Sequence, residues 1–146
     1  MLCQGCILVV EDDADLREAI RQHVERLGCR VLVAGDGEAA LDRLEDSIPA
    51  QPCLILADVN MPRLGGVELA RAVRAGNCRC SSTTPVVTMS AETRHEQPPG
   101  TEAHLGKPFA ARDLDLTVAR LCRGGPAPNR VAASGPPVLR RSVAAR

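Results

Sequence analysis

Residues 52–62 read PCLILADVNMP, and the rest of the chain can be interpreted around this segment. The apolar run from Cys53 to Ala57 has the length of a β-strand that is buried on both faces. Asp58 follows it directly, and Met61-Pro62 ends the strand. Open α/β sheets place their chemistry at the carboxyl ends of their strands. Asp58 is therefore the first candidate for a functional residue.

The composition predicts one domain with an aliphatic core. The chain has 146 residues, 45% of them hydrophobic, with one Phe and no Trp or Tyr. It contains no run of the roughly 18 apolar residues that a membrane span needs. The first residues also lack the charged-then-apolar layout of a signal peptide. We therefore expect a cytoplasmic protein without membrane contact.

Short apolar segments alternate with amphipathic segments along the chain. The pattern predicts strands over residues 6–10, 30–34, 53–57, 85–89 and 103–106, and helices over residues 14–27, 38–46, 67–75 and 110–122. Asp13 and Gly28 are expected to cap the first of these helices. Such an alternation predicts an α/β fold with a parallel sheet, right-handed crossovers and helices on both faces.

Three acids follow two of the predicted strands and should meet at one edge of the sheet. These are Glu11, Asp12 and Asp58. Carboxylates about 4 Å apart repel by roughly 4 kcal/mol per pair at an effective dielectric constant near 20, so the cluster needs a cation or a proton. Mg²⁺ suits oxygen ligands, and Asp58, Asp12 and the backbone carbonyl of Asn60 are candidate ligands.

Two further side chains are expected at the same edge. Ser90 would supply a hydroxyl donor, and Lys107 a point charge suited to a phosphoryl oxygen. A carboxylate can act as the nucleophile of a phosphoryl transfer, and such a transfer depends mostly on positioning and charge neutralisation. The set therefore predicts phosphoryl transfer to Asp58, with an acyl phosphate as the product.

Four segments resemble the signatures of the receiver domain of bacterial two-component response regulators. They occur in the family's order across residues 6–122, and they are Ile7–Asp13, Asp58–Pro62, Val86–Ala91 and Lys107–Phe109. The resemblance implies a CheY-like protein with a flavodoxin-like, doubly wound sheet of five parallel strands in the order 2-1-3-4-5.

The resemblance also assigns roles to individual residues. It implies that Asp58 accepts phosphate from a histidine kinase or phosphotransfer protein, and that Glu11 and Asp12 hold Mg²⁺. Ser90 would switch toward the phosphate and Lys107 would contact it, in a phosphoacceptor signalling domain rather than an enzyme. The peptide bond from Lys107 to Pro108 is usually cis in this family.

Three more positions bear on the lifetime and the transmission of the signal. In receivers the residues two positions after the phosphorylated Asp and the switch Ser line the path of the hydrolytic water; here they are Asn60 and Glu92. The pair resembles that of the chemotaxis regulator and implies a short-lived phosphoryl state. His104 stands where the family usually has the aromatic second half of its switch; a structural histidine on an edge strand is the favoured interpretation, and an aromatic switch is the alternative.

The fourth helix of the family is expected to be shortened or irregular. Only 17 positions separate Ser90 from Lys107, and they include Gln97-Pro98-Pro99-Gly100. A proline inside a helix costs about 3 kcal/mol. The change affects a face through which many receivers grip partners, so a docking module that works without phosphorylation is a second hypothesis. A phosphatase of the haloacid dehalogenase type is a third hypothesis, but such enzymes require a second Asp at the position where this chain has Asn60.

Residues 123–146 differ in composition from residues 1–122, which we interpret as the receiver domain. They hold five Arg and no acid, so the other 13 of the 18 basic residues accompany all 18 acidic residues in residues 1–122, a net charge of −5. Their Pro, Gly and Ala content predicts a disordered basic tail without a DNA-binding module. A receiver that stands alone and signals through protein contacts to an unidentified target is the leading interpretation, and a linker to a further domain is the alternative.

Seven cysteines are expected at the sheet edge opposite Asp58: Cys3, Cys6, Cys29, Cys53, Cys78, Cys80 and Cys122. Unpaired thiols are the favoured interpretation for a cytosolic protein. A thiolate metal or redox site that combines the pairs at 3/6 and 78/80 is the alternative.

Overall fold

A five-stranded parallel sheet forms the centre of the computed structural model, which describes residues 5–46, 52–76, 82–91 and 97–122. The strands are β1 (Cys6–Val10), β2 (Arg30–Ala34), β3 (Pro52–Asp58), β4 (Val86–Ser90) and β5 (Ala103–Gly106). Their order is β2-β1-β3-β4-β5, and every neighbouring pair is parallel. The predicted flavodoxin-like topology is therefore confirmed.

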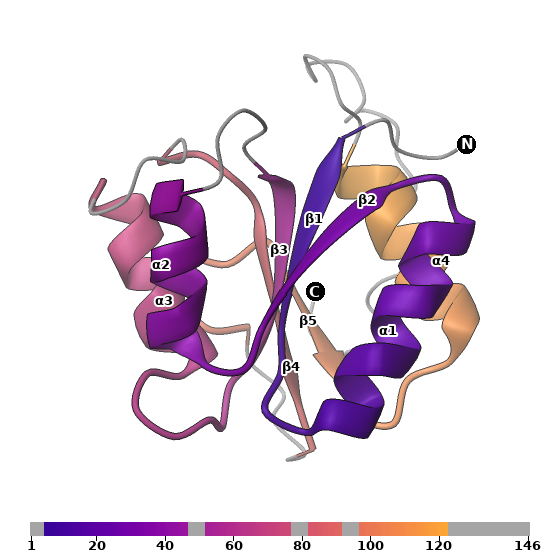
Figure 1. The fold of residues 1–146 in the computed structure, drawn as a ribbon, viewed down its shortest axis with the longest axis horizontal. Coiled ribbons are helices and arrows are strands. Elements are labelled where there is room, and N and C mark those ends of the chain that lie inside the picture. Colours follow the sequence, from indigo (N-terminus) through magenta and orange to yellow (C-terminus); the bar gives the residue numbers. More distant parts are fainter. Residues whose placement is uncertain (1–4, 47–51, 77–81, 92–96, 123–146) are drawn as a thin grey trace.

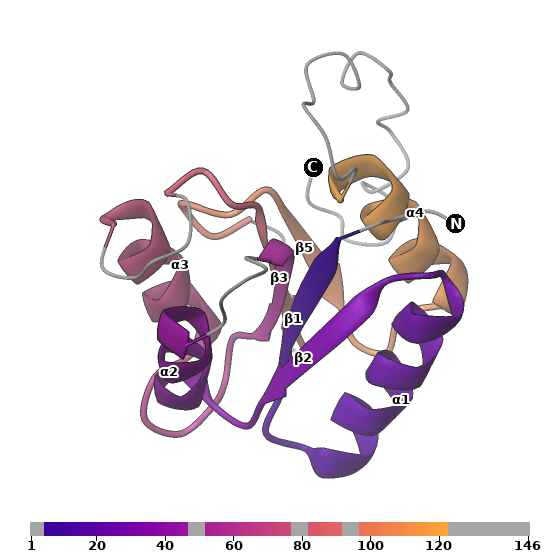
Figure 2. The same cartoon turned by 45° about the horizontal axis from the view of Figure 1, so that its top comes forward.

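Helices cover both faces of this sheet, as predicted (Figure 1 and, from a tilted view, Figure 2). They are α1 (Ala14–Arg26), α2 (Gly37–Asp46), α3 (Gly66–Arg74) and α4 (Ala111–Leu121). The first and last lie on one face, and α2 and α3 lie on the other. The bounds of all nine elements lie within one residue of those that the sequence predicted.

Alternate side chains of the central strands enter two separate cores, because successive residues of a strand point to opposite faces. Val9 of β1 packs with Val24 of α1 and Val118 of α4 in one core. Val10 packs with Leu69 of α3 in the other. All five residues of β1 are buried, which explains why its sequence is apolar throughout.

Acidic residues cap the helices that follow β1 and β2. The Asp13 carboxylate accepts hydrogen bonds from the amides of Asp15 and Leu16 at 3.0 and 3.2 Å, as the sequence predicted. Asp36 accepts one from the amide of Ala39 at 2.8 Å. These caps fix the turns by which the chain leaves the carboxyl edge of the sheet.

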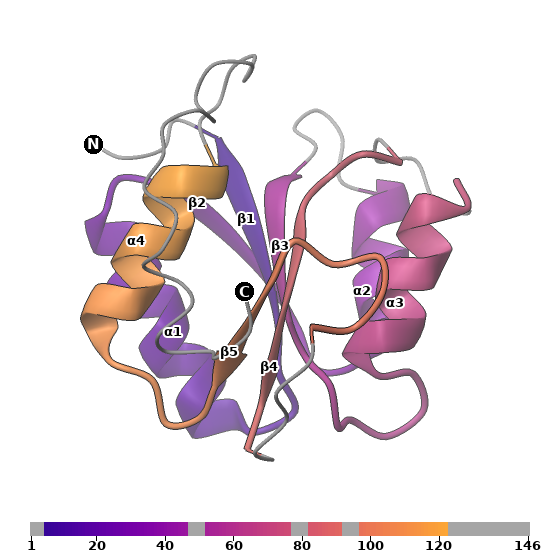
Figure 3. The same cartoon turned by 180° about the vertical axis from the view of Figure 1, so that it is seen from behind.

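No helix connects β4 to β5 in the described part of that connection, which comprises residues 91 and 97–102. Residues 97–102 form instead a tight turn, in which the Thr101 hydroxyl donates to the Pro98 carbonyl at 2.6 Å. This loop runs from the edge of the sheet to α3 and returns to β5 (Figure 3). The expected irregular fourth helix agrees with it, while residues 92–96 lie outside the described residues. The label α4 therefore belongs to the helix that follows β5.

The loop is fastened to α3 by Arg74, the last residue of that helix. The Arg74 guanidinium donates to the Thr84 carbonyl at 2.7 Å and to the Glu102 carboxylate at 2.9 Å. Glu102 also accepts the Val86 amide at 2.9 Å. A Cβ atom at Gly100, where φ is +82°, would lie 3.7 Å from the Arg74 side chain, so the loop turns directly over α3.

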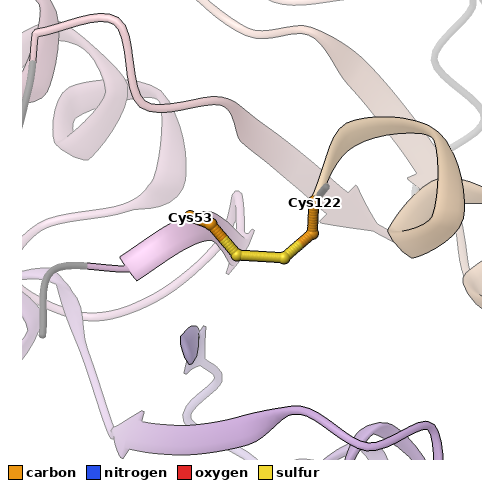
Figure 4. The surroundings of a disulfide bond; sticks show 2 residues. All are labelled: Cys53 and Cys122. Carbon is orange, nitrogen blue, oxygen red and sulfur yellow. A yellow bond between two sulfur atoms is a disulfide. The ribbon is translucent and has the colours of Figure 1, made fainter. Parts of the chain in front are cut away.

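One expectation about the cysteines is wrong. Cys53 and Cys122 form a disulfide between the start of β3 and the end of α4 (Figure 4). Their Cα atoms lie 5.5 Å apart, within the usual range for a bridged pair, because α4 ends beside the start of β3. Cys6 and Cys29 are free thiols, as expected. Cys3, Cys78 and Cys80, on which the metal alternative depended, lie outside the described residues, as does the predicted tail over residues 123–146.

Among the helices that the structure describes, none combines the length and the apolar character needed to cross a membrane.

Candidate functional site

Three carboxylates converge at the carboxyl edge of the sheet. Glu11 and Asp12 directly follow β1, and Asp58 is the last residue of β3. One oxygen from each of them lies within 4.8 Å of the others. Glu11 and Asp58 are 1% and 5% exposed, whereas Asp12 is exposed. The parallel pairing of β1 with β3 brings these acids together, as the sequence predicted.

Two glycines set the path of the chain just after Asp58. A Cβ atom at Gly66 would lie 2.7 Å from the Asp58 carbonyl oxygen, and one at Gly65 would lie 2.3 Å from the Val59 carbonyl oxygen. No side chain fits there, so α3 can begin directly against the end of β3. The Asn60 amide donates to Asp58 Oδ1 at 3.3 Å, which orients the carboxylate.

Lys107 brings a positive charge into the acidic cluster. Its Nζ lies 2.9 Å from Glu11 Oε1 and 3.3 Å from Asp58 Oδ2. The Lys107 amide donates to the Ser90 carbonyl at 2.8 Å, which holds the end of β5 against β4. The peptide bond to Pro108 is cis, as the family resemblance implied.

The pKa values of Glu11 and Lys107 are shifted by burial and by the contact between the two side chains. Burial raises the pKa of the Glu11 carboxyl, and hydrogen bonds from Lys107 and from the Asp13 amide offset only part of that effect. Burial alone would lower the pKa of the Lys107 ammonium, but Glu11 and Asp58 outweigh it and the pKa is raised. Lys107 is therefore charged at neutral pH.

The donor set fits a hard divalent cation. Three carboxylates carry more negative charge than Lys107 offsets, and carboxylate oxygens are the ligands that Mg²⁺ prefers. Among the described residues, these three carboxylates are the metal-ligating side chains that lie close enough together to hold an ion. The predicted ligands Glu11, Asp12 and Asp58 are thus brought together, and Asn60 lies beside them.

Ser90 lies on β4, the strand next to β3, and His104 lies on β5 at the edge of the sheet. Ser90 is fully buried at the end of β4, at the same sheet edge as Asp58, because β4 pairs with β3 in register. His104 of β5 is 1% exposed, and its Nδ1 lies 2.6 Å from the Thr88 hydroxyl. This buried, hydrogen-bonded ring agrees with a structural histidine, and its role in switching stays a prediction. Glu92 lies outside the described residues.

Two arginines near the site have no counterpart among the predicted residues. Arg17 of α1 donates to the Glu11 carbonyl at 2.8 Å. Arg63, at a positive φ of 70° in the loop after β3, pairs with Asp36 and lies 3.7 Å from Glu38. The contact to Asp36 ties the loop that carries Asn60 to the loop after β2. No sequence pattern marks either pair, because each bridges separate segments.

The fold and the acidic site define a doubly wound α/β protein with a carboxylate cluster at the carboxyl edge of its sheet. The family model of the response regulator receiver domain matches residues 7–119. The chain therefore belongs to this family and is a receiver domain of two-component systems.

Relatives include transcriptional regulators and a probable histidine kinase of Oryza sativa subsp. indica. The chain is 34% identical to the transcriptional regulatory protein CpxR of Escherichia coli over 122 residues, which cover 80% of this chain and 49% of CpxR. It thus spans about half the length of the curated relatives of this kind that it matches.

Solved receiver structures have the same fold. The receiver domain of sensor histidine kinase PA1611 from Pseudomonas aeruginosa PAO1, solved with a magnesium ion in its active site cleft, has a TM-score of 0.71 and 26% identity, with 82% of this chain and 98% of that chain covered. The chemotaxis response regulator CheY4 of Vibrio cholerae has a TM-score of 0.69 and 28% identity, with coverage of 81% and 98%.

Proposed function

We propose that this receiver accepts a phosphoryl group on Asp58 from a histidine kinase or a phosphotransfer protein. The observation that carries the proposal is the convergence of Glu11, Asp12 and Asp58 within 4.8 Å, with Lys107 Nζ 3.3 Å from Asp58. A carboxylate surrounded by cation-binding groups at a strand end is arranged for reaction with phosphate.

In the proposed reaction an Asp58 carboxylate oxygen attacks the phosphorus of the donor's phosphohistidine. The phosphorus–nitrogen bond breaks, the imidazole nitrogen keeps the bonding electrons, and Asp58 becomes an acyl phosphate. Lys107 exchanges part of its contact with Glu11 for a phosphoryl oxygen, and the Ser90 hydroxyl donates to another. Glu11, Asp12, Asp58 and the Asn60 carbonyl would hold Mg²⁺, which offsets the charge of the phosphoryl oxygens when bound.

In this proposal the phosphorylated domain signals by binding a partner protein. Residues 1–122 act as a receiver in the cytoplasm, without binding DNA or membrane themselves, and pass the signal to a partner protein. The protein works as a signalling module and not as an enzyme on other substrates. Asn60 and Glu92 admit the hydrolytic water, so the phosphoryl group is lost quickly.

Acetyl phosphate with MgCl₂ tests the proposal directly, with the intact mass of the protein as the readout. We expect the wild type to gain one phosphoryl group, and Asp58→Asn to gain none. Asp42→Asn is the matched control, because Asp42 is an exposed acid on α2. Chelation of Mg²⁺ should abolish the gain, and decay after removal of the donor within minutes would support the role of Asn60 and Glu92.

A docking module that works without phosphorylation is the second candidate function. It is favoured by the loop over residues 97–102, which stands where receivers have helical structure on the face that follows β4. Wild-type protein that gains no phosphoryl group, while it binds Mg²⁺ in calorimetry, would favour this function over the first.

A further inference from the structure

A disulfide joins two segments far from the acidic site. Cys53 is the second residue of β3, whose last residue is Asp58, and Cys122 follows directly after α4. The bond links positions 69 residues apart at the edge of the sheet opposite Asp58 (Figure 4). It therefore fastens the C-terminal end of α4 to the start of the central strand.

The two partners differ in exposure. Cys122 is fully buried, whereas Cys53 is half-buried. Cys6 and Cys29 are buried free thiols, and burial raises the pKa of both. A raised pKa leaves little thiolate at neutral pH, so these two thiols react slowly with oxidants and disulfides. They provide internal references for the pair at 53 and 122.

We propose that Cys53 and Cys122 are a reversible redox couple that fastens and releases the end of α4. The proposal rests on the cytoplasmic location in the proposed function, because disulfides in a reducing compartment are usually transient and redox-sensing. The half-buried Cys53 is the entry point for an oxidant, and the buried Cys122 is the resolving thiol.

The oxidant in the proposed couple is a peroxide, such as hydrogen peroxide. The Cys53 thiolate attacks one peroxide oxygen, the O–O bond breaks, and the departing hydroxide takes up a proton to become water, which leaves a sulfenic acid on Cys53. The Cys122 thiolate then attacks the Cys53 sulfur and expels the second hydroxide, also released as water. Two thiols lose two electrons and two protons, and one peroxide becomes two water molecules. A dithiol reductant reverses the step by thiol–disulfide exchange.

Release of the bond changes the last turn of α4 and leaves the acidic site in place. Leu114 and Val118 keep the middle of α4 in the core, because both are buried there among residues of the sheet and of α1. The redox state of the two cysteines therefore changes the end of α4, while the surroundings of Asp58 at the opposite edge of the sheet stay the same.

Peptide mapping of the full chain tests the couple. After peroxide treatment, alkylation and trypsin, we expect residues 121–123 to be cross-linked to residues 44–63, because trypsin cleaves after Arg43, Arg63, Arg120 and Arg123. Dithiothreitol should remove the cross-link from the folded protein, and peroxide should restore it. Cys53→Ser should abolish it and Cys29→Ser should keep it.

Three outcomes would overturn the proposal: alkylation of both thiols after peroxide, a cross-link from Cys122 to another cysteine, or a bond that resists excess dithiothreitol in the folded state. Amide hydrogen exchange adds a second measurement on the wild type, which needs no substitution. We expect reduction to speed exchange in residues 118–122 and to lower Tm by roughly 10 °C. Asp58→Asn should keep the cross-link, so a failure of the proposed function is distinguishable from a failure of the redox couple.

Discussion

Lys107 Nζ lies 2.9 Å from Glu11 Oε1 although the two residues are 96 positions apart. The contact joins the end of β5 to the end of β1 across the carboxyl edge of the sheet. Lys107 is the only lysine in the chain, and its ammonium also lies 3.3 Å from Asp58. One cation therefore offsets part of the repulsion among three clustered carboxylates, and a bound Mg²⁺ would offset more of it.

This relationship predicts a Mg²⁺-dependent cost for removing the lysine. Lys107→Met leaves the buried Glu11 carboxylate without its cationic partner, which destabilises the folded protein. Because Lys107 is partly exposed, solvent screens part of this effect, and we expect a loss of about 2 kcal/mol in the free energy of unfolding without divalent ions. Saturating Mg²⁺ should narrow the difference from the wild type. Urea unfolding followed by circular dichroism measures both values. Arg71→Met, on the exposed side of α3, is the control and should leave the unfolding free energy at its wild-type value both without and with Mg²⁺. If Mg²⁺ stabilised the wild type and Lys107→Met equally, the prediction would be contradicted.

The close approach of α3 to β3 predicts that Gly66 tolerates no side chain. In Gly66→Ala the new Cβ would meet the Asp58 carbonyl at 2.7 Å, so the backbone beside Asp58 must shift. We expect a loss of about 1–3 kcal/mol in unfolding free energy, together with slower phosphorylation by acetyl phosphate. Gly35→Ala is the matched control, because its Cβ would meet only the end of the Arg17 side chain at 3.7 Å. Phosphorylation of Gly66→Ala at the wild-type rate would disprove the argument.

The sequence predicted the elements and the acidic site because both follow from local patterns and topology. Parallel strands must end at one edge, so Asp58, Glu11 and Lys107 could be placed together once the strands were recognised. The Pro-Pro-Gly segment likewise predicted an irregular connection, and the described residues 97–102 are not helical. Pairings between separate segments could not be read in this way, because they depend on how helices cross the sheet.

The cysteines illustrate that limit. All seven were expected at the edge opposite Asp58, but which of them meet depends on where α4 ends relative to β3. A general expectation for cytosolic proteins favoured free thiols, and it failed at Cys53 and Cys122. Arg74 is a similar case, because its partners Thr84 and Glu102 come from two other segments.

The Thr88–His104 contact predicts an energetic coupling between β4 and β5. Thr88→Val removes the hydrogen bond to His104 Nδ1 within a fully buried pair, so we expect a loss of about 1–2 kcal/mol in unfolding free energy. In a His104→Phe background the same change should cost less, since no ring nitrogen is left to pair. A double-mutant cycle by urea unfolding should give a coupling of about 1 kcal/mol. Additive effects of the two substitutions would show that the contact carries no energy.

The Asp36 cap predicts a loss of stability that depends on pH. The Ala39 amide, and then Arg63, lower the pKa of the Asp36 carboxyl in the folded protein. A lowered pKa means that the stabilisation is present above the unfolded value near 3.9 and is lost as the pH falls through the folded value. Asp36→Ala should therefore cost about 1 kcal/mol at pH 7 and less in strong acid. Thermal unfolding across pH measures it, with Asp42→Ala on the exposed side of α2 as the control. A cost that stays constant down to pH 2 would refute it.

Arg74 predicts a separate effect on the loop over residues 97–102. Its guanidinium reaches the Ser82 and Thr84 carbonyls at 3.0 and 2.7 Å and the Glu102 carboxylate at 2.9 Å, so it joins α3 to the segments on both sides of β4. Arg74→Ala removes all three contacts. We expect faster amide hydrogen exchange in residues 97–102, while exchange in β1 and β3 stays slow because their residues are buried in the two cores.

Arg71→Ala is the control, because Arg71 lies one helical turn earlier on α3 and is exposed. The loop over residues 97–102 stands where receivers have helical structure after β4. If this loop is well ordered, a partner protein meets a single conformation of that face. If Arg74→Ala leaves the exchange of residues 97–102 unchanged, the internal hydrogen bond from Thr101 to Pro98 is sufficient to hold the loop, and α3 does not contribute to its order.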